Sequence, residues 1–180
     1  MLPNMNLSEA RSESIRPGGY IMRILAVEID EKYNRLKLKC DIASGPMEGY
    51  YKRLEDRAGF WGMYVSMYMD EKSRWKFART IDAIKESNPD FEWDYDGQND
   101  EQKLVNNLIG VVTRLKYYTG NDGQEKSKIV PYATVSVTDI KTDNFKVPDP
   151  ITQYDDAPVG GVVDTTSGGF EDLRTDDMPF

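Results

Sequence analysis

The sequence predicts a mainly β protein built around one domain, and three observations support this prediction. Several short segments are rich in β-branched and aromatic residues, and turns containing Gly, Pro or Asn separate them. One of these segments, 35–43, alternates between basic and apolar residues, as a half-exposed strand does. Of the 180 residues, 39% are hydrophobic, which is enough to fill a core.

Three extended segments are expected in the first part of the domain. The first covers 18–30 and follows Pro17. The second covers 35–43, with apolar side chains on one face and cations on the other. After a turn that contains Ser, Gly and Pro, the third runs from 50 to 69 and is rich in aromatic residues.

A helix is expected next, from 73 to 86, because apolar residues recur there at helical spacing. Ser73 is the expected N-cap, and Pro89 ends the segment. A shorter helix is expected over 100–107. The apolar stripe of the longer helix consists of Phe77, Ile81 and Ile84.

Two further strands, over 108–120 and 127–140, close the domain. The Asn-Asp-Gly sequence at 121–123 between them is a strong turn signal, and Pro131 predicts an edge strand or a bulge. Three strands, a helix between strands 3 and 4, and two strands match the five-stranded Greek-key barrel called the OB-fold. Other small β barrels share this order.

The charge distribution divides the chain into three parts. A flexible N-terminal arm is expected at 1–16, and the folded domain at 17–146. The segment 147–180 carries eight acidic residues and one arginine, within a chain whose net charge is −8. Its prolines, glycines and acids follow no period, which predicts a disordered acidic tail.

The composition excludes several classes of protein. Because the chain has no histidine, no mechanism that uses imidazole is open to it. Its single cysteine cannot form an internal disulfide, and no zinc site is expected. No apolar run is long enough to span a membrane, and the N-terminus lacks the apolar core of a signal peptide. We therefore expect a cytoplasmic protein that is not an enzyme and uses no metal or cofactor.

Cations on strands form the first candidate binding surface. On the second strand, Arg35, Lys37 and Lys39 project from one face about 6.6 Å apart, a spacing that can follow the phosphates of a single strand. Exposed strand faces also carry cations merely for solvation, so the pattern alone leaves both interpretations open. Further candidates on the last hairpin are Arg114, Lys116, Tyr118, Lys126 and Lys128.

Aromatic residues form the second candidate surface. The third extended segment carries Phe60, Trp61, Tyr64 and Tyr68. Bases stack on such rings with about 1–3 kcal/mol each, whatever the base. Because strand side chains alternate, about half of these rings are expected in the core. Trp61 and Tyr64 are the candidates here, and Tyr117 or Tyr118 on the following strand.

An acidic row alternates with aromatic residues between 90 and 96. Paired carboxylates can hold a divalent metal for phosphoryl chemistry, which would make the protein a nuclease. The calcium-loop template fails, because neither Asp90 nor Asp94 has a glycine at the required sixth position. We interpret the row as an extended segment with its aromatic residues packed inward and its acids in water.

The end of the chain carries the most specific motif: Asp176, Asp177, Met178, Pro179 and Phe180. An acidic tail that ends in this way closely resembles the C-terminal tip of bacterial single-stranded DNA-binding proteins. The segments 17–30, 85–89 and 117–123 are similar to phage-encoded single-stranded DNA-binding proteins. The chain differs from the bacterial proteins in its long segment 75–107, its N-terminal arm and a tail that is not rich in glutamine.

The resemblance implies an OB-fold protein that coats single-stranded DNA in phage replication, recombination and repair. Its tip would recruit replication, recombination and repair proteins through the terminal carboxylate, the Phe ring and the two acids. It implies a location in the cytoplasm of a host bacterium, and it leaves the oligomeric state open, a homo-oligomer included. The alternative is an OB-fold adaptor of the replication machinery that binds proteins and not DNA.

An acidic tail beside a nearly neutral domain can compete with DNA for cationic groups. Deleting 176–180 is therefore expected to tighten binding to single-stranded DNA at low salt, because a competing negative charge is removed. Fluorescence anisotropy of a labelled oligo-dT strand measures the change. Equal affinities with and without the five residues would contradict this autoinhibition.

Overall fold

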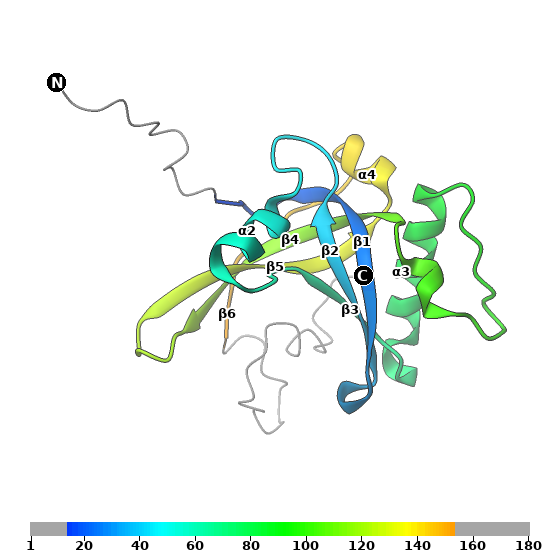
Figure 1. Cartoon of the computed structure of the whole chain (residues 1–180), viewed down its shortest axis with the longest axis horizontal. Coiled ribbons are helices and arrows are strands. Elements are labelled where there is room, and N and C mark those ends of the chain that lie inside the picture. Colours follow the sequence, from blue (N-terminus) through cyan, green and yellow to red (C-terminus); the bar gives the residue numbers. More distant parts are fainter. Residues whose placement is uncertain (1–13, 154–180) are drawn as a thin grey trace.

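An antiparallel sheet forms the centre of the molecule, and the computed structural model describes residues 14–153. The strands follow the order β3-β2-β1-β4-β5, and a short sixth strand pairs with β4 in parallel (Figure 1). The strands are β1 (Gly19–Asp30), β2 (Arg35–Ile42), β3 (Tyr64–Tyr68), β4 (Leu108–Thr119), β5 (Glu125–Val135) and β6 (Ile151–Thr152). The helices are α2 (Tyr50–Ala58), α3 (Arg74–Ser87) and α4 (Val137–Lys141), with 3-10 turns η1 (Glu31–Tyr33), η2 (Glu71–Ser73) and η3 (Glu101–Leu104).

The mainly β architecture and the helix after the third strand confirm the coarse prediction of the fold. Strand β1 holds the sheet together, because it pairs with β2 on one side and with β4 on the other. Strands β3 and β5 end the row of paired strands, so the sheet is open between them. We call this opening the seam. Helix α3 lies beside it, and Thr80 Oγ1 is 2.8 Å from Thr134 Oγ1 of β5.

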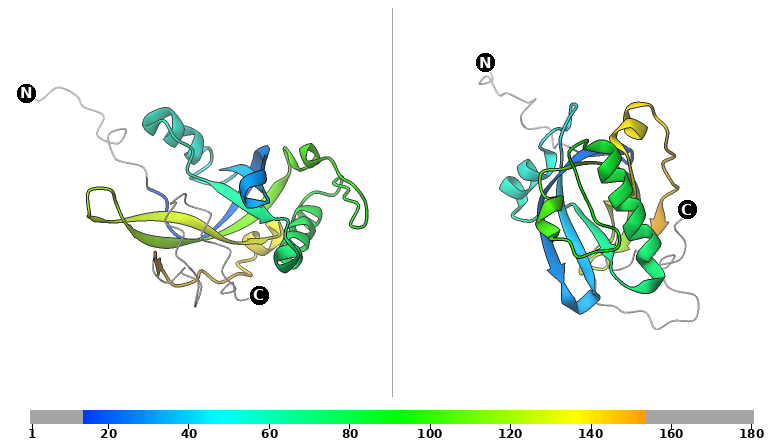
Figure 2. Two further views of the ribbon diagram at one scale, coloured as in Figure 1. Left: turned by 90° about the horizontal axis from the view of Figure 1, so that it is seen from below. Right: turned by 90° about the vertical axis from the view of Figure 1, so that its right-hand side faces the viewer.

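One core lies between the sheet and α3. Leu36, Leu38 and Cys40 are buried, whereas the two lysines between them are partly exposed, so the alternation predicted for β2 is confirmed. Ile81 and Ile84, which were predicted to face the core from the helix, are buried in the same cluster. In Figure 2, the right-hand view shows α3 running along one side of the curved sheet.

The prediction of an extended segment from 50 to 69 is wrong over its first half, which forms α2. Residues 52–58 are mostly strong helix formers, and the aromatic residues around them concealed this preference. The carboxylate of Asp41 accepts hydrogen bonds from the backbone N–H groups of Tyr51 and Lys52, at 2.9 and 3.1 Å. It therefore satisfies donors that the first turn of a helix leaves unpaired. The third strand is correspondingly short.

The predicted long helix is confirmed within one residue at each end, as α3. Its expected N-cap, Ser73, makes no side-chain cap, and Asp70 instead accepts from the Ser73 N–H to cap η2. Asn88 joins the end of α3 to β4, because its side chain donates to Ile84 O and Leu108 O and accepts from the Leu108 N–H. In place of the shorter helix predicted over 100–107, only the 3-10 turn η3 forms.

The last hairpin is confirmed with one correction. Its turn contains Gly123 at a φ of 76°, and the register of β4 and β5 shifts beside Pro131, as the proline predicted. The second strand of this hairpin, β5, ends at Val135, whereas the sequence had predicted an end near 140. Ser136 begins α4 there, because its hydroxyl and the Asp139 carboxylate form a reciprocal capping box.

The ordered structure extends beyond the predicted domain limits of 17 and 146. Ile15 packs against the core, and β6 pairs with β4 where Ile151 lies opposite Lys116. Residues 1–13 and 154–180, which include the tip Asp176–Phe180, lie outside the described residues. None of the helices within 14–153 is long and apolar enough to cross a membrane.

A buried ion pair fixes the end of the β1–β2 hairpin. The Nε and Nη2 atoms of Arg35 each lie 2.9 Å from Asp30 Oδ2, and Nη1 lies 3.2 Å from Ser66 Oγ and 3.4 Å from the Tyr68 hydroxyl. The Arg35 side chain is only 3% exposed. Partial burial by itself would raise the pKa of Asp30, but the hydrogen bond and charge of Arg35 outweigh it and lower that pKa.

We expect Asp30→Asn to reduce the free energy of unfolding by about 2 kcal/mol at neutral pH, because the buried Arg35 guanidinium loses its acidic partner while keeping its contacts with Ser66 and Tyr68. A lowered carboxyl pKa stabilises the folded state above the pKa of an unfolded aspartate, and this contribution is lost as pH falls through the lowered value. The difference from the wild type should therefore shrink as pH falls below the usual aspartate pKa of about 3.9. Urea unfolding at neutral pH and at a series of lower pH values measures it.

Asp122→Asn is the matched control, because the Asp122–Lys126 pair is exposed and its atoms are 3.4 Å apart. Such a pair contributes about 0–1 kcal/mol. A similar loss of stability in both variants would contradict a structural role of the Arg35–Asp30 pair.

Candidate nucleic-acid interface

A groove of about 680 Å³ brings together candidate residues from three strands. One wall is formed by β2 and the start of β3, a second by α2 and the loop after it, and a third by β5. In the left-hand view of Figure 2, α2 lies above the β4–β5 hairpin. We call this the basic groove. Its lining includes the predicted residues Arg35, Lys37, Trp61, Tyr64 and Lys128.

Trp61 is held rigidly at the edge of β2. Its indole Nε1–H lies 3.1 Å from Cys40 O and 2.9 Å from Met63 O, so the ring cannot turn without losing hydrogen bonds. The Lys39 ammonium lies 4.1 Å from the ring centroid, and the Tyr51 ring packs 6.4 Å away. The indole is thus fixed against the sheet beside a cation.

A second cation lies beside an aromatic ring further along the same face. The Lys37 ammonium is 4.6 Å from the centroid of Tyr64, and β2 and β3 pair so that Lys39 stands opposite Tyr64. Lys39 also reaches Glu55 of α2, at 3.8 Å. The result is two cation–aromatic pairs side by side, which can offer charge to phosphates and ring faces to bases.

Three of the predicted cations are buried. Arg35, Arg114 and Lys116 are exposed by only 3%, 8% and 3%. Arg35 is paired with Asp30, and the Arg114 guanidinium lies 5.1 Å from the Tyr132 ring. Their side chains are covered in this structure, so they offer a ligand far less surface than the lysines of β2 do.

The remaining candidates lie toward the tip of the β4–β5 hairpin. Tyr118 stands opposite Lys126, and the Lys128 ammonium lies 5.2 Å from the Tyr118 ring. Lys126 is exposed and pairs with Asp122 in the turn. The hairpin thus repeats the cation–aromatic arrangement of β2 and β3, and of its three candidates only Lys128 lines the basic groove.

Two residues that were not chosen as site residues also line this groove. Phe60 was expected on the aromatic segment, but it lies in the loop between α2 and β3 and is 57% exposed. The glycines on both sides of the Phe60-Trp61 pair mark such a loop. Ile15 also lines the groove, although its position in the expected N-terminal arm gave no indication of this.

The acidic row between 90 and 96 shows the expected packing in part. Phe91 is buried and stacks on Trp93 at a centroid distance of 6.0 Å, while the acids are exposed. Tyr95 departs from the pattern, because it is 49% exposed and donates to Asp82. Within residues 14–153, no three acidic, Cys or His side chains lie close enough together to hold a metal ion.

Comparison with known proteins assigns no relative to this chain: its sequence matches no protein-family model, and no curated protein is significantly similar to it.

Tyr51 lies between the basic groove and the core. Its ring lines the groove and its hydroxyl is buried, with no hydrogen-bond partner within the described part of the chain. Burial raises the pKa of Tyr51 far above its usual range, so the hydroxyl keeps its proton at neutral pH. A buried polar group without a partner costs about 1–3 kcal/mol.

Tyr51→Phe is therefore expected to raise the free energy of unfolding by about 1 kcal/mol, because it removes only the unpaired hydroxyl. Urea unfolding measures the change. Tyr68→Phe serves as the control, since that hydroxyl accepts from Arg35. A loss of stability in Tyr51→Phe would show that the hydroxyl has a partner.

Proposed function

We propose that this protein binds single-stranded DNA in the basic groove, coats it largely independently of sequence, and acts in phage DNA replication, recombination and repair. The observation that carries the proposal is the pair of partly exposed lysines on β2, Lys37 and Lys39, each beside an aromatic ring. In this proposal the protein is not an enzyme.

The strand order supports an OB-fold as the architecture behind this function. In that fold a five-stranded, partly open Greek-key barrel binds oligonucleotides on the face of strands 2 and 3 and on the neighbouring loops. Here the sheet is open at the seam, β2 and β3 carry the cation–aromatic pairs, and the β4–β5 hairpin projects beside them (Figure 1). If the fold is an OB-fold, the predicted residues on β2 and β3 lie on the face that binds a strand in that fold, which supports the proposal.

Binding exchanges one set of contacts for another. A base that stacks on Trp61 takes over the ring face beside Lys39, and the displaced ammonium can then pair with a phosphate. Lys39 must also leave Glu55, whose like charge opposes an approaching phosphate. Because each phosphate contact releases counterions, affinity falls steeply as salt rises.

The acidic composition is compatible with this proposal because the charge is unevenly distributed. Most of the net charge of −8 belongs to 147–180, and the rest of the chain is nearly neutral. A local row of lysines can therefore attract a strand in spite of the low isoelectric point of about 4.7.

The tip Asp176–Phe180 extends the proposal to partners. Its two acids, Pro and terminal Phe suit an apolar pocket rimmed by cations on replication, recombination or repair proteins. Encoded by a phage, the protein would act in the cytoplasm of its bacterial host. An adaptor that binds only proteins is the outcome that the following experiment separates from this proposal.

The first experiment measures fluorescence anisotropy of labelled oligo-dT and of a matched duplex, at low and moderate salt. We expect tight binding to the single strand only, weakening as salt rises. The charge reversal Lys37→Glu with Lys39→Glu should weaken this binding about 100-fold, because two phosphate contacts become repulsive.

A double variant with the same change of charge provides the control. Lys103 and Lys141 are exposed and lie on η3 and α4, away from the basic groove, so Lys103→Glu with Lys141→Glu should lower affinity far less. No binding of oligo-dT at low salt would overturn the proposal and favour the adaptor. Equal losses in both double variants would show that only net charge matters.

A further inference from the structure

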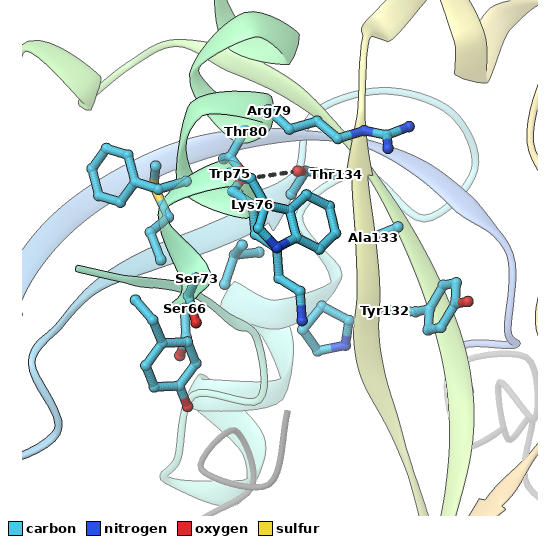
Figure 3. A pocket seen from close by; sticks show the side chains of 14 residues that line it. Ser66, Ser73, Trp75, Lys76, Arg79, Thr80, Tyr132, Ala133 and Thr134 are labelled. Carbon is cyan, nitrogen blue, oxygen red and sulfur yellow. Dashed lines mark hydrogen bonds between the residues drawn. The ribbon is translucent and has the colours of Figure 1, made fainter. Parts of the chain in front are cut away.

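A second, smaller pocket lies at the seam, and no sequence pattern had indicated it. Strand β3 contributes 65–68, β5 contributes 131–134, and the first half of α3 closes the pocket. Figure 3 shows Trp75 and Lys76 of α3 projecting between Ser66 of β3 and Thr134 of β5. We call it the seam pocket.

The seam pocket combines an aromatic ring with cations. Trp75 is 44% exposed, which is a large apolar surface to leave in water. Lys76 and Arg79 from the same helix also line the pocket, and the Lys76 ammonium lies 5.4 Å from the Trp75 ring centroid. The basic groove likewise presents an indole beside a cation.

The two sites adjoin at both edges of the seam, because consecutive residues of each edge strand line one site and then the other. On β3, Tyr64 lines the basic groove and the next residue, Val65, lines the seam pocket. On β5, Val130 lines the groove and Pro131 lines the pocket. Strand β3 advances about 3.3 Å per residue, so a ligand that follows its five residues from the basic groove would extend about 13 Å further.

From this adjacency we infer that the seam pocket is a second subsite for single-stranded DNA, in which Trp75 stacks on a base and Arg79 pairs with a phosphate. The inference rests on the proposed function, because it extends the path of the same strand beyond the basic groove. Strands that fill only the groove do not reach Trp75, and longer strands do.

A strand of nucleic acid fits the seam pocket better than a peptide for two reasons. The two charged residues that line the pocket, Lys76 and Arg79, are both cations, although Asp139 of α4 interacts electrostatically with Arg79. It also adjoins cation–aromatic pairs of the same kind, and such repetition suits a ligand whose own units repeat. An acidic peptide is the competing occupant, and the experiment includes it.

The experiment measures the affinity of the full chain for oligo-dT strands of about 4 to 16 nucleotides, the range that one OB-fold covers. Trp75→Ala should weaken binding of the longest strands about tenfold and leave the shortest unchanged. Arg79→Gln should do the same, and should lower the slope of log affinity against log salt by about one unit. Thermal unfolding confirms that the variants fold.

Matched controls come from the same region of the molecule. Tyr95 is exposed to a similar degree as Trp75 but lines a different pocket, on the other side of α3. Lys85 is an exposed cation near the other end of α3. Tyr95→Ala and Lys85→Gln should therefore leave the affinity for strands of every length within about twofold of the wild type.

A direct readout uses tryptophan fluorescence. Stacking on Trp75 should quench the emission of the wild type with long strands, and Trp75→Phe should remove that part of the quenching, whereas Trp93→Phe should not. A peptide of the sequence Asp-Asp-Met-Pro-Phe is added at a concentration that supplies the same total negative charge as the strand. It should produce no change in fluorescence that depends on Trp75.

The outcomes separate this inference from the proposed function. If Trp75→Ala binds strands of every length like the wild type while the Lys37 and Lys39 reversal abolishes binding, the seam subsite is overturned and the basic groove stands. If the peptide alone perturbs Trp75 and Arg79→Gln removes the effect, the pocket is a peptide site and the inference is overturned. Absence of any strand binding overturns both.

Discussion

The pairing of β1 with two neighbours is the constraint on which the other features of this structure depend. It pairs with β2 on one edge and with β4 on the other, so it fixes the register of both halves of the sheet. A slip of one residue would turn every β2 side chain to the opposite face. Lys37 and Lys39 would then enter the core, and Leu38 and Cys40 would replace them on the surface. The buried Arg35–Asp30 pair at the end of the hairpin opposes such a slip, because it satisfies both charges in one register only.

The segment between β2 and β3 places aromatic rings beside the lysines of β2, which together form the candidate binding surface. Asp41, the next-to-last residue of β2, accepts hydrogen bonds from the first turn of α2, so a single carboxylate ties the end of the strand to the start of the helix. After α2, the chain returns with Phe60 and Trp61 in a short loop, and the indole is tied to backbone oxygens on both sides of it. The aromatic residues therefore lie beside the β2 lysines although they are remote from them in sequence. A rigid ring beside a cation loses little conformational entropy when a base stacks on it.

The seam explains why both candidate surfaces lie along one line. An open sheet leaves two edge strands with unpaired backbone groups, and proteins cover such edges. Helix α3 covers part of this opening, with the hydroxyls of Thr80 and Thr134 in contact across it. The basic groove lies at one end of the opening and the seam pocket at the other. Both candidate surfaces thus lie where β3 and β5 do not pair with each other, and the side chains along those edges decide what the opening can hold.

The sequence by itself determined the features that depend on local patterns: the alternation of β2, the length of α3, the last hairpin with its irregularity at Pro131, and the acidic segment at the end. It did not determine α2 or α4: in α2 the neighbouring aromatic residues concealed the helix formers at 52–58, and α4 depends on the capping box of Ser136 and Asp139. Only the tertiary structure decided which cations are available. Arg35 and Lys37 occupy equivalent positions in the alternating pattern of β2. Arg35 is nevertheless buried against Asp30, whereas Lys37 lies beside Tyr64 in the groove. The period of a strand fixes the face of a side chain, whereas its burial depends on neighbours that are distant in the chain.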